Sequence, residues 1–214
     1  DIVSVFPEYF DVLDLSLLGK AKSKGLISVR AHNLRDWTHD VHQSVDDTPV
    51  GGGAGMVMKP AVWAECLDEL LGIHTESPDR PILIFPNPSA PLFTQQDATE
   101  LSHAQHLVFG CGRYEGYDAR IPVYYRERGV DVREYSIGDY VLNGGEVAVS
   151  VMLEAITRLL LGFMGNPDSI VEESYTGGNA LLEHNQYTKP ATWRGLDVPA
   201  VLLSGDHAKV DRFR

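Results

Sequence analysis

Short apolar stretches recur along the first two thirds of the chain, and most of them run into glycine, proline or polar residues. Compact apolar runs of this kind, without helical spacing, are typical of buried β-strands. They predict strands at 1–6, 26–33, 81–86, 106–112 and 129–135.

Apolar residues at helical spacing predict helices at 7–25, at 60–71, from about 94, and at 145–161. The polar, glycine-rich stretch 36–55 predicts a long loop. Alternating strands and helices indicate an α/β fold with a largely parallel sheet.

Three of the predicted strands lead into loops marked by glycine or proline. These loops read "FPNPSAP" at 85–91, "GCGRYEG" at 110–116 and "SIGDYVLNGGE" at 136–146. Ligands of parallel sheets bind beyond the carboxyl ends of the strands. We therefore expect the three loops to meet around one pocket.

Composition and charge narrow the class of protein. The chain has 214 residues, 43% of them hydrophobic, which is enough for one core and a small second domain. Its net charge of −12 weighs against a general nucleic-acid binder. Between Leu15 and Arg35, however, five basic residues occur without an acid. They form either a face that docks phosphates or an ordinary solvated surface.

Cellular location and completeness follow from a few further features. No apolar run is long enough for a transmembrane helix, so no membrane partner is expected. Cys66 and Cys111 match no metal-binding spacing and are expected to be reduced and buried, as in a cytoplasmic protein. The absence of an initial methionine and the charged end at Arg214 suggest missing residues, more of them at the C-terminus.

The glycine-rich loops do not match the standard phosphate-binding patterns. "GGGAGMVMK" at 51–59 lacks the spacing of a P-loop, and 110–116 has the wrong glycine spacing for a dinucleotide fingerprint. Tight turns explain these glycines equally well. The loop at 136–146 combines glycines with apolar side chains and has no cation, which suits a flat uncharged heterocycle such as adenine.

Several charged residues are candidates for chemistry. Arg158 interrupts an apolar helix and either pairs with Glu154 or stabilises negative charge in a site. Glu172 and Glu173 are either general bases or solvated acids. His39 and His42 have no further ligand cluster, so no metal site is assigned.

Five stretches together resemble one family. "VDDTPVGGGAGMVM", "CGRYEG", "SIGDYVLNGGE", "QYTKP" and "VLLSGDHAKV" are similar, in order along nearly the whole chain, to bacterial tRNA (guanine-N1)-methyltransferases, the TrmD type of the SPOUT superfamily. The resemblance implies methyl transfer from S-adenosylmethionine to N1 of the guanosine immediately 3′ of the anticodon in tRNA. It also implies a homodimer, magnesium dependence and a deep trefoil knot, which connection rules alone would not suggest.

Site residues are carried over from the family position by position. The resemblance implies that Arg158 and Glu173 are catalytic and that Ser174, Asp47 and Gly53 contact the substrate. The residues implied to bind the cofactor are Phe85, Pro86, Asn87, Pro88, Gly112, Tyr114, Glu115, Ser136, Ile137, Gly138, Tyr140, Leu142, Gly144 and Gly145.

The chain departs from the family pattern near its implied base. It reads "EES" at 172–174 where the family usually has "EDS", so Glu173 stands in place of an aspartate. The implied domains are a knotted cofactor-binding domain at 1–161, a flexible linker at 162–174, and the start of a small, mainly helical tRNA-binding domain at 175–214 that looks truncated. Two alternatives remain open: a ribose 2′-O-methyltransferase of the same superfamily and a non-catalytic RNA-binding protein.

Overall fold

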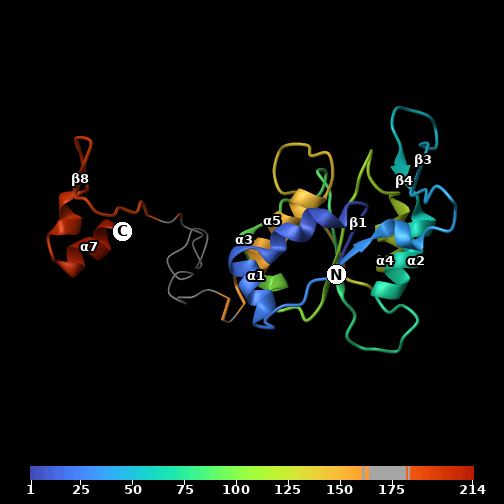
Figure 1. Ribbon diagram of the computed structural model, residues 1–214, viewed down its shortest axis with the longest axis horizontal. Helices are drawn as coiled ribbons and strands as arrows, with labels where there is room; N and C mark the ends of the chain where they lie inside the picture. The colour runs from blue at the N-terminus through green and yellow to red at the C-terminus, as the bar shows by residue number, and fades with distance from the viewer. Residues whose placement is uncertain (161, 164–181, 183) are drawn as a thin grey trace. The chain divides into compact units, whose positions relative to one another are not determined.

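A computed structural model describes residues 1–160, 162–163, 182 and 184–214 (Figure 1). The chain divides into two compact units, Asp1–Gly165 and Asn166–Arg214. Among the described helices, none combines the length and the apolar character that a membrane crossing requires.

The first unit is built on a five-stranded sheet in which every neighbouring pair is parallel. In spatial order its strands are β2 (Ala31–Asn33), β1 (Ile2–Ser4), β6 (Leu107–Gly110), β5 (Ile82–Pro86) and β7 (Val132–Tyr135). The α/β class with a largely parallel sheet is therefore confirmed.

Helices cover both faces of this sheet (Figure 1). On one face, α2 (Pro60–Leu70) and α4 (Arg120–Glu127) pack against strand residues such as Leu83 and Phe85. On the other face, α3 (Gln95–Leu101) and α5 (Glu146–Thr157) pack against alternate residues such as Ile84. Because successive strand residues face opposite layers, both faces of the central strands must be apolar, as in "PILIFP".

The helix expected at 7–25 is wrong as a single element. A 3-10 helix, η1 (Pro7–Asp14), is followed by α1 (Ser16–Ser23), and the chain is extended at Leu15 between them. Ser16 has a φ of 55°, a left-handed value that a continuing helix does not allow. The break allows η1 and α1 each to bury its own apolar residues in the same core.

Two other expectations were also too coarse, and one helix was not expected. Only Ala31–Asn33 of the strand expected at 26–33 forms a ladder. The loop expected at 36–55 overlaps a 3-10 helix, η2 (Leu34–Trp37), and contains β3 (Asp46–Asp47), which pairs with β4 (Val57–Met58) in a small hairpin. Helix α4 was not predicted, because it is short, has Pro122 in its first turn and carries charged residues at both ends.

The second unit is small. Its described elements are β8 (Thr192–Trp193), β9 (Leu196–Asp197), the 3-10 helix η3 (Ala200–Leu203) and α7 (His207–Phe213). Strands β8 and β9 form an antiparallel hairpin whose turn, Arg194–Gly195, has positive φ at both residues. Most of the expected linker at 162–174 lies outside the described residues, so the domain boundaries stay a prediction.

Candidate functional site

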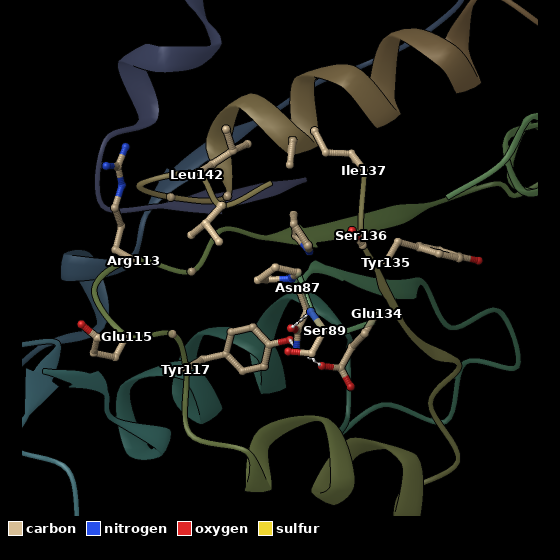
Figure 2. Close-up of a pocket in the computed structure, with 18 of the residues that line it drawn as sticks. Asn87, Ser89, Arg113, Glu115, Tyr117, Glu134, Tyr135, Ser136, Ile137 and Leu142 are labelled. Atoms are coloured by element: carbon tan, nitrogen blue, oxygen red, sulfur yellow. Dashed lines mark hydrogen bonds between the residues drawn. The ribbon is translucent and has the colours of Figure 1, made fainter. Parts of the chain in front are cut away.

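A pocket of about 530 Å³ opens beyond the carboxyl ends of β5, β6 and β7 (Figure 2). The loops that follow these strands, together with the start of α5 and one side of α4, form its wall. Thirteen of the fourteen residues predicted to bind a cofactor line it: Pro86, Asn87, Pro88, Gly112, Tyr114, Glu115, Ser136, Ile137, Gly138, Tyr140, Leu142, Gly144 and Gly145.

Phe85 is the predicted residue that does not reach the pocket. Its side chain is fully buried beneath the loops, where it packs edge-on against Trp63 and lies 4.4 Å from Tyr117 between ring centroids. A Cβ at Gly110 would lie 2.2 Å from the Phe85 ring, so that glycine makes room for the ring. Phe85 therefore supports the pocket floor from below.

Backbone hydrogen bonds join the three loops. Gly145 N donates to Gly112 O at 2.9 Å, which ties the loop after β7 to the loop after β6. Ser136 N donates to Pro91 O at 2.9 Å and Phe93 N donates to Ser136 O at 2.8 Å, which ties the same loop to the one after β5. The pocket is thus preformed by main-chain contacts between segments far apart in the sequence.

Gly144 and Gly145 are required by close contacts. A Cβ at Gly145 would lie 3.0 Å from Cys111 Cα and 3.1 Å from Gly112 N, both of them backbone atoms. At Gly144 a Cβ would lie 2.5 Å from Arg113 Nε and 2.6 Å from Glu146 Oε2. These two glycines allow the loop to lie directly on its neighbour.

A buried ion pair lies under this contact. Arg113 Nε donates to Glu146 Oε1 at 3.2 Å, and Ser4 Oγ donates to the same oxygen at 2.8 Å. The guanidinium also stands over the rings of Phe6 and Tyr9, at 4.9 and 5.3 Å from their centroids. Burial disfavours the charged guanidinium, but its interactions with Tyr9 and Glu146 raise the pKa of Arg113.

One end of the pocket is polar. Tyr117 Oη and Asn87 Nδ2 both donate to Glu134 Oε2, at 2.6 and 3.0 Å, and Arg126 donates to Glu134 Oε1 at 3.2 Å. Burial works against the carboxylate, but these three hydrogen bonds hold the pKa of Glu134 below its ordinary value. Burial, with the Glu134 contact, raises the pKa of Tyr117, so this hydroxyl stays protonated.

The other end of the pocket is apolar. Figure 2 shows Ile137 and Leu142 beside α5, away from Tyr117 and Glu134. Leu142 is 41% exposed, so part of its side chain remains open to a ligand. The lining residues that sequence reasoning missed include Ser89, Arg113, Tyr117, Arg126 and Glu134. Ser89 and Arg113 fall within quoted stretches. Tyr117 directly follows one, Glu134 lies two positions before another, and neither carried a separate signal.

Of the predicted substrate residues, Asp47 and Gly53 are not among the lining residues. The hairpin of β3 and β4 contacts the pocket loop through Glu115 N, which donates to Met56 O at 2.9 Å, and through Gly55, which packs against the Glu115 side chain. This hairpin carries Asp47 and Gly53, both exposed. Glu173 and Ser174 lie outside the described residues.

Arg158 ends α5 and is not among the lining residues. It stands thirteen positions beyond Gly145, which is about 20 Å along the helix at 1.5 Å per residue. No group of three or more His, Cys, Asp or Glu residues in the described part of the chain could hold a metal ion, and magnesium dependence stays a prediction.

Comparison with known proteins identifies the family. A sequence model described as "tRNA (Guanine-1)-methyltransferase TrmD" matches residues 1–214. The chain is 83% identical to a tRNA (guanine-N(1)-)-methyltransferase of Bifidobacterium animalis subsp. lactis, with 100% of this chain and 81% of the relative covered. It is 57% identical to one of Cutibacterium acnes, with 100% and 89% covered, and 58% identical to one of Clavibacter sepedonicus, with 100% and 91% covered. The chain therefore belongs to the tRNA (guanine-1)-methyltransferase TrmD family.

Proposed function

We propose that this chain transfers a methyl group from S-adenosylmethionine to N1 of the guanosine immediately 3′ of the anticodon in tRNA. The observation that carries the proposal is the coincidence of two independent results. The family match extends over every residue, and thirteen of the fourteen residues carried over as cofactor contacts line one preformed pocket.

The pocket suits S-adenosylmethionine in size and in chemistry. Its volume of about 530 Å³ lies within the range of small-molecule sites. Ile137, Tyr140 and Leu142 offer apolar surface for the adenine, and Gly144 and Gly145 contribute backbone to the same pocket wall. The polar end of the pocket suits the ribose and the amino-acid tail.

The proposal includes a deep trefoil knot. The loops after β5, β6 and β7 are joined to one another by backbone hydrogen bonds. An isolated antiparallel bridge between Arg113 and Gly144 adds to these contacts. Such mutual contacts support loops that pass through one another.

The proposal also includes a homodimer. Along α5, Val147 and Val151 are 51% and 45% exposed, and Glu154 and Arg158 continue the same helical stripe. Neighbouring η1, which packs against α5, exposes Tyr9 at 47% and Val12 at 52%. An apolar surface of this kind, beside a functional pocket, is suited to binding a second copy of the chain.

A twofold pairing of α5 helices would explain the distance of Arg158 from the pocket. In a symmetric dimer the same surface faces itself. If the two α5 helices run antiparallel, Arg158 at the end of one helix lies near Gly145 at the start of the other. Each cofactor pocket would then be completed by the arginine of the other protomer.

The proposed chemistry divides between two residues. The carboxylate of Glu173 accepts the proton from guanine N1, and the N1 electron pair then forms a bond to the methyl carbon as the carbon–sulfur bond breaks. The Arg158 guanidinium stabilises the negative charge that moves onto O6. S-adenosylmethionine supplies the electrophilic methyl group, so the protein contributes mainly positioning and electrostatics. Asp47, Gly53 and Ser174 contact the tRNA. Mg²⁺, if used, would be held by carboxylates that are not assigned.

Nucleoside analysis tests the activity itself. A tRNA transcript with guanosine 3′ of the anticodon, incubated with the protein and S-adenosylmethionine, should yield 1-methylguanosine by mass spectrometry. Replacing that guanosine by adenosine is the control and should abolish the product. A 2′-O-methylated nucleoside would identify the rival methyltransferase, and tRNA binding without any methylated product would indicate a non-catalytic RNA-binding protein.

Leu142→Ala tests the apolar end of the pocket. The variant should raise the dissociation constant for S-adenosylmethionine about tenfold by calorimetry, because it removes most of an apolar side chain that the ligand covers. Its thermal stability should change little, since Leu142 is 41% exposed. Val41→Ala, at a position 95% exposed and outside the pocket lining, is the matched control. Unchanged affinity in Leu142→Ala would argue against this placement of the adenine.

Val151→Glu tests the homodimer. A charge at the middle of the exposed α5 stripe should shift sedimentation at micromolar concentration from dimer to monomer, because an unpaired buried charge is costly at an interface. Val41→Glu adds the same charge elsewhere and should remain dimeric. A wild-type protein that sediments as a monomer would contradict the proposed dimer directly.

Glu173→Gln tests the proposed base. The substitution keeps the shape of the side chain and removes its basicity, so the single-turnover methylation rate should fall by about 10²-fold or more. Affinity for S-adenosylmethionine should be nearly unchanged. Glu172→Gln is the neighbouring control and should have little effect. If Glu172→Gln instead lowers the rate, the alignment of this segment to the family is wrong by one residue. If neither substitution lowers the rate, the base lies elsewhere, with Asp168 and Glu183 as the next candidates.

A further inference from the structure

The carboxylate of Glu134 joins three segments of the pocket wall that are distant in sequence. It lies on β7, while Asn87 follows β5 and Tyr117 belongs to the loop after β6. Its Oε2 accepts from Tyr117 Oη at 2.6 Å and from Asn87 Nδ2 at 3.0 Å. Figure 2 shows these three side chains converging at the polar end of the pocket.

The second carboxylate oxygen is also occupied. Glu134 Oε1 accepts from Arg126 at 3.2 Å, and Arg126 Nε donates to Val132 O at 3.3 Å, which ties α4 to β7. The Glu134 side chain is 20% exposed. With three donors from three elements, the carboxylate holds the wall together, and it also lines the pocket.

Tyr117 is fixed at both ends of its side chain. Its ring packs on Phe85, with centroids 4.4 Å apart, and a Cβ added at Gly112 would lie 3.3 Å from its Cδ1. Its backbone also lies next to the hairpin, through an isolated bridge with Met58. The hydrogen bond from the Tyr117 hydroxyl to Glu134 therefore helps to fix the position, relative to β7, of the loop that carries Tyr114 and Glu115.

We propose that Glu134 and Tyr117 are positioning residues. They fix the spacing between the loop after β5, the loop after β6 and strand β7, and so keep the S-adenosylmethionine pocket open in its binding geometry. The inference rests on the proposed function, because it concerns the same pocket. Each joined segment carries lining residues next to its member of the cluster: Pro86 and Pro88 flank Asn87, Tyr114 and Gly116 precede Tyr117, and Tyr135 and Ser136 follow Glu134.

The expected effect follows from the population of the open pocket. When only a fraction of molecules is competent to bind, the apparent dissociation constant rises by the inverse of that fraction. Loss of a hydrogen bond to a carboxylate is sufficient to reduce that fraction about tenfold. Tyr117→Phe, which keeps the ring, and Glu134→Gln, which keeps the shape, should each weaken S-adenosylmethionine binding by about this factor.

Tyr125→Phe is the matched control. Tyr125 is also a buried tyrosine that donates to a carboxylate, Asp68 Oδ1 at 2.7 Å, but this pair joins α4 to α2 and does not line the pocket. Removal of either hydroxyl should lower the unfolding temperature. Only Tyr117→Phe should weaken cofactor binding, while Tyr125→Phe should bind within about twofold of wild type.

Calorimetry with S-adenosylmethionine tests the positioning role. It is carried out on the full chain as the wild type, the two single variants and the double variant. If the two residues act as one unit, Tyr117→Phe combined with Glu134→Gln should bind about tenfold more weakly than wild type, no worse than either single change. Effects that multiply to about a hundredfold would mean that the hydroxyl contacts the ligand independently, and would overturn the positioning role. Wild-type affinity in Tyr117→Phe would also overturn it. Absence of binding to wild type would overturn the proposed function, and this inference with it.

Discussion

The pocket depends on the contact between Gly145 and the backbone of Cys111 and Gly112. Gly145 N donates to Gly112 O at 2.9 Å, and the space for a Cβ is already taken by backbone atoms. Because α5 begins at the next residue, Glu146, this contact presses the start of the helix against the end of β6. A side chain at this position would force the backbone of Cys111 and Gly112 to shift by a few tenths of an ångström.

The buried ion pair beneath this contact acts on the same junction. Glu146 is 1% exposed, and its Oε1 holds both Arg113 from the pocket loop and Ser4 from β1. Burial of charge is expensive unless hydrogen bonds satisfy it, and Glu146 Oε2 is buried without a hydrogen-bond partner. The pair is therefore weak evidence for net stability, but its contacts join β1, the loop after β6 and α5.

The sequence predicted the parts of the molecule in which local pattern and burial agree. Strands such as 81–86 are apolar on both faces because helices cover both sides of the sheet, and the three ligand loops followed from the parallel arrangement alone. Helix α4 escaped prediction because it is short, with Pro122 in its first turn and charged residues at both ends. The break at Ser16 arises from tertiary packing that periodicity does not encode. The Glu134 cluster could not be predicted either, because its members meet only through the order of the strands.

The acids of the pocket wall also bear on where the proton acceptor lies. Among the described lining residues, the carboxylates are those of Glu115 and Glu134. Glu134 accepts three hydrogen bonds, and its lowered pKa makes it a weaker base than an ordinary carboxylate. Glu115 packs against Gly55 of the hairpin, and in Figure 2 its side chain points away from the middle of the pocket. The described wall therefore holds and orients a ligand without presenting a free base to it, which favours a base delivered by another segment, as proposed for Glu173.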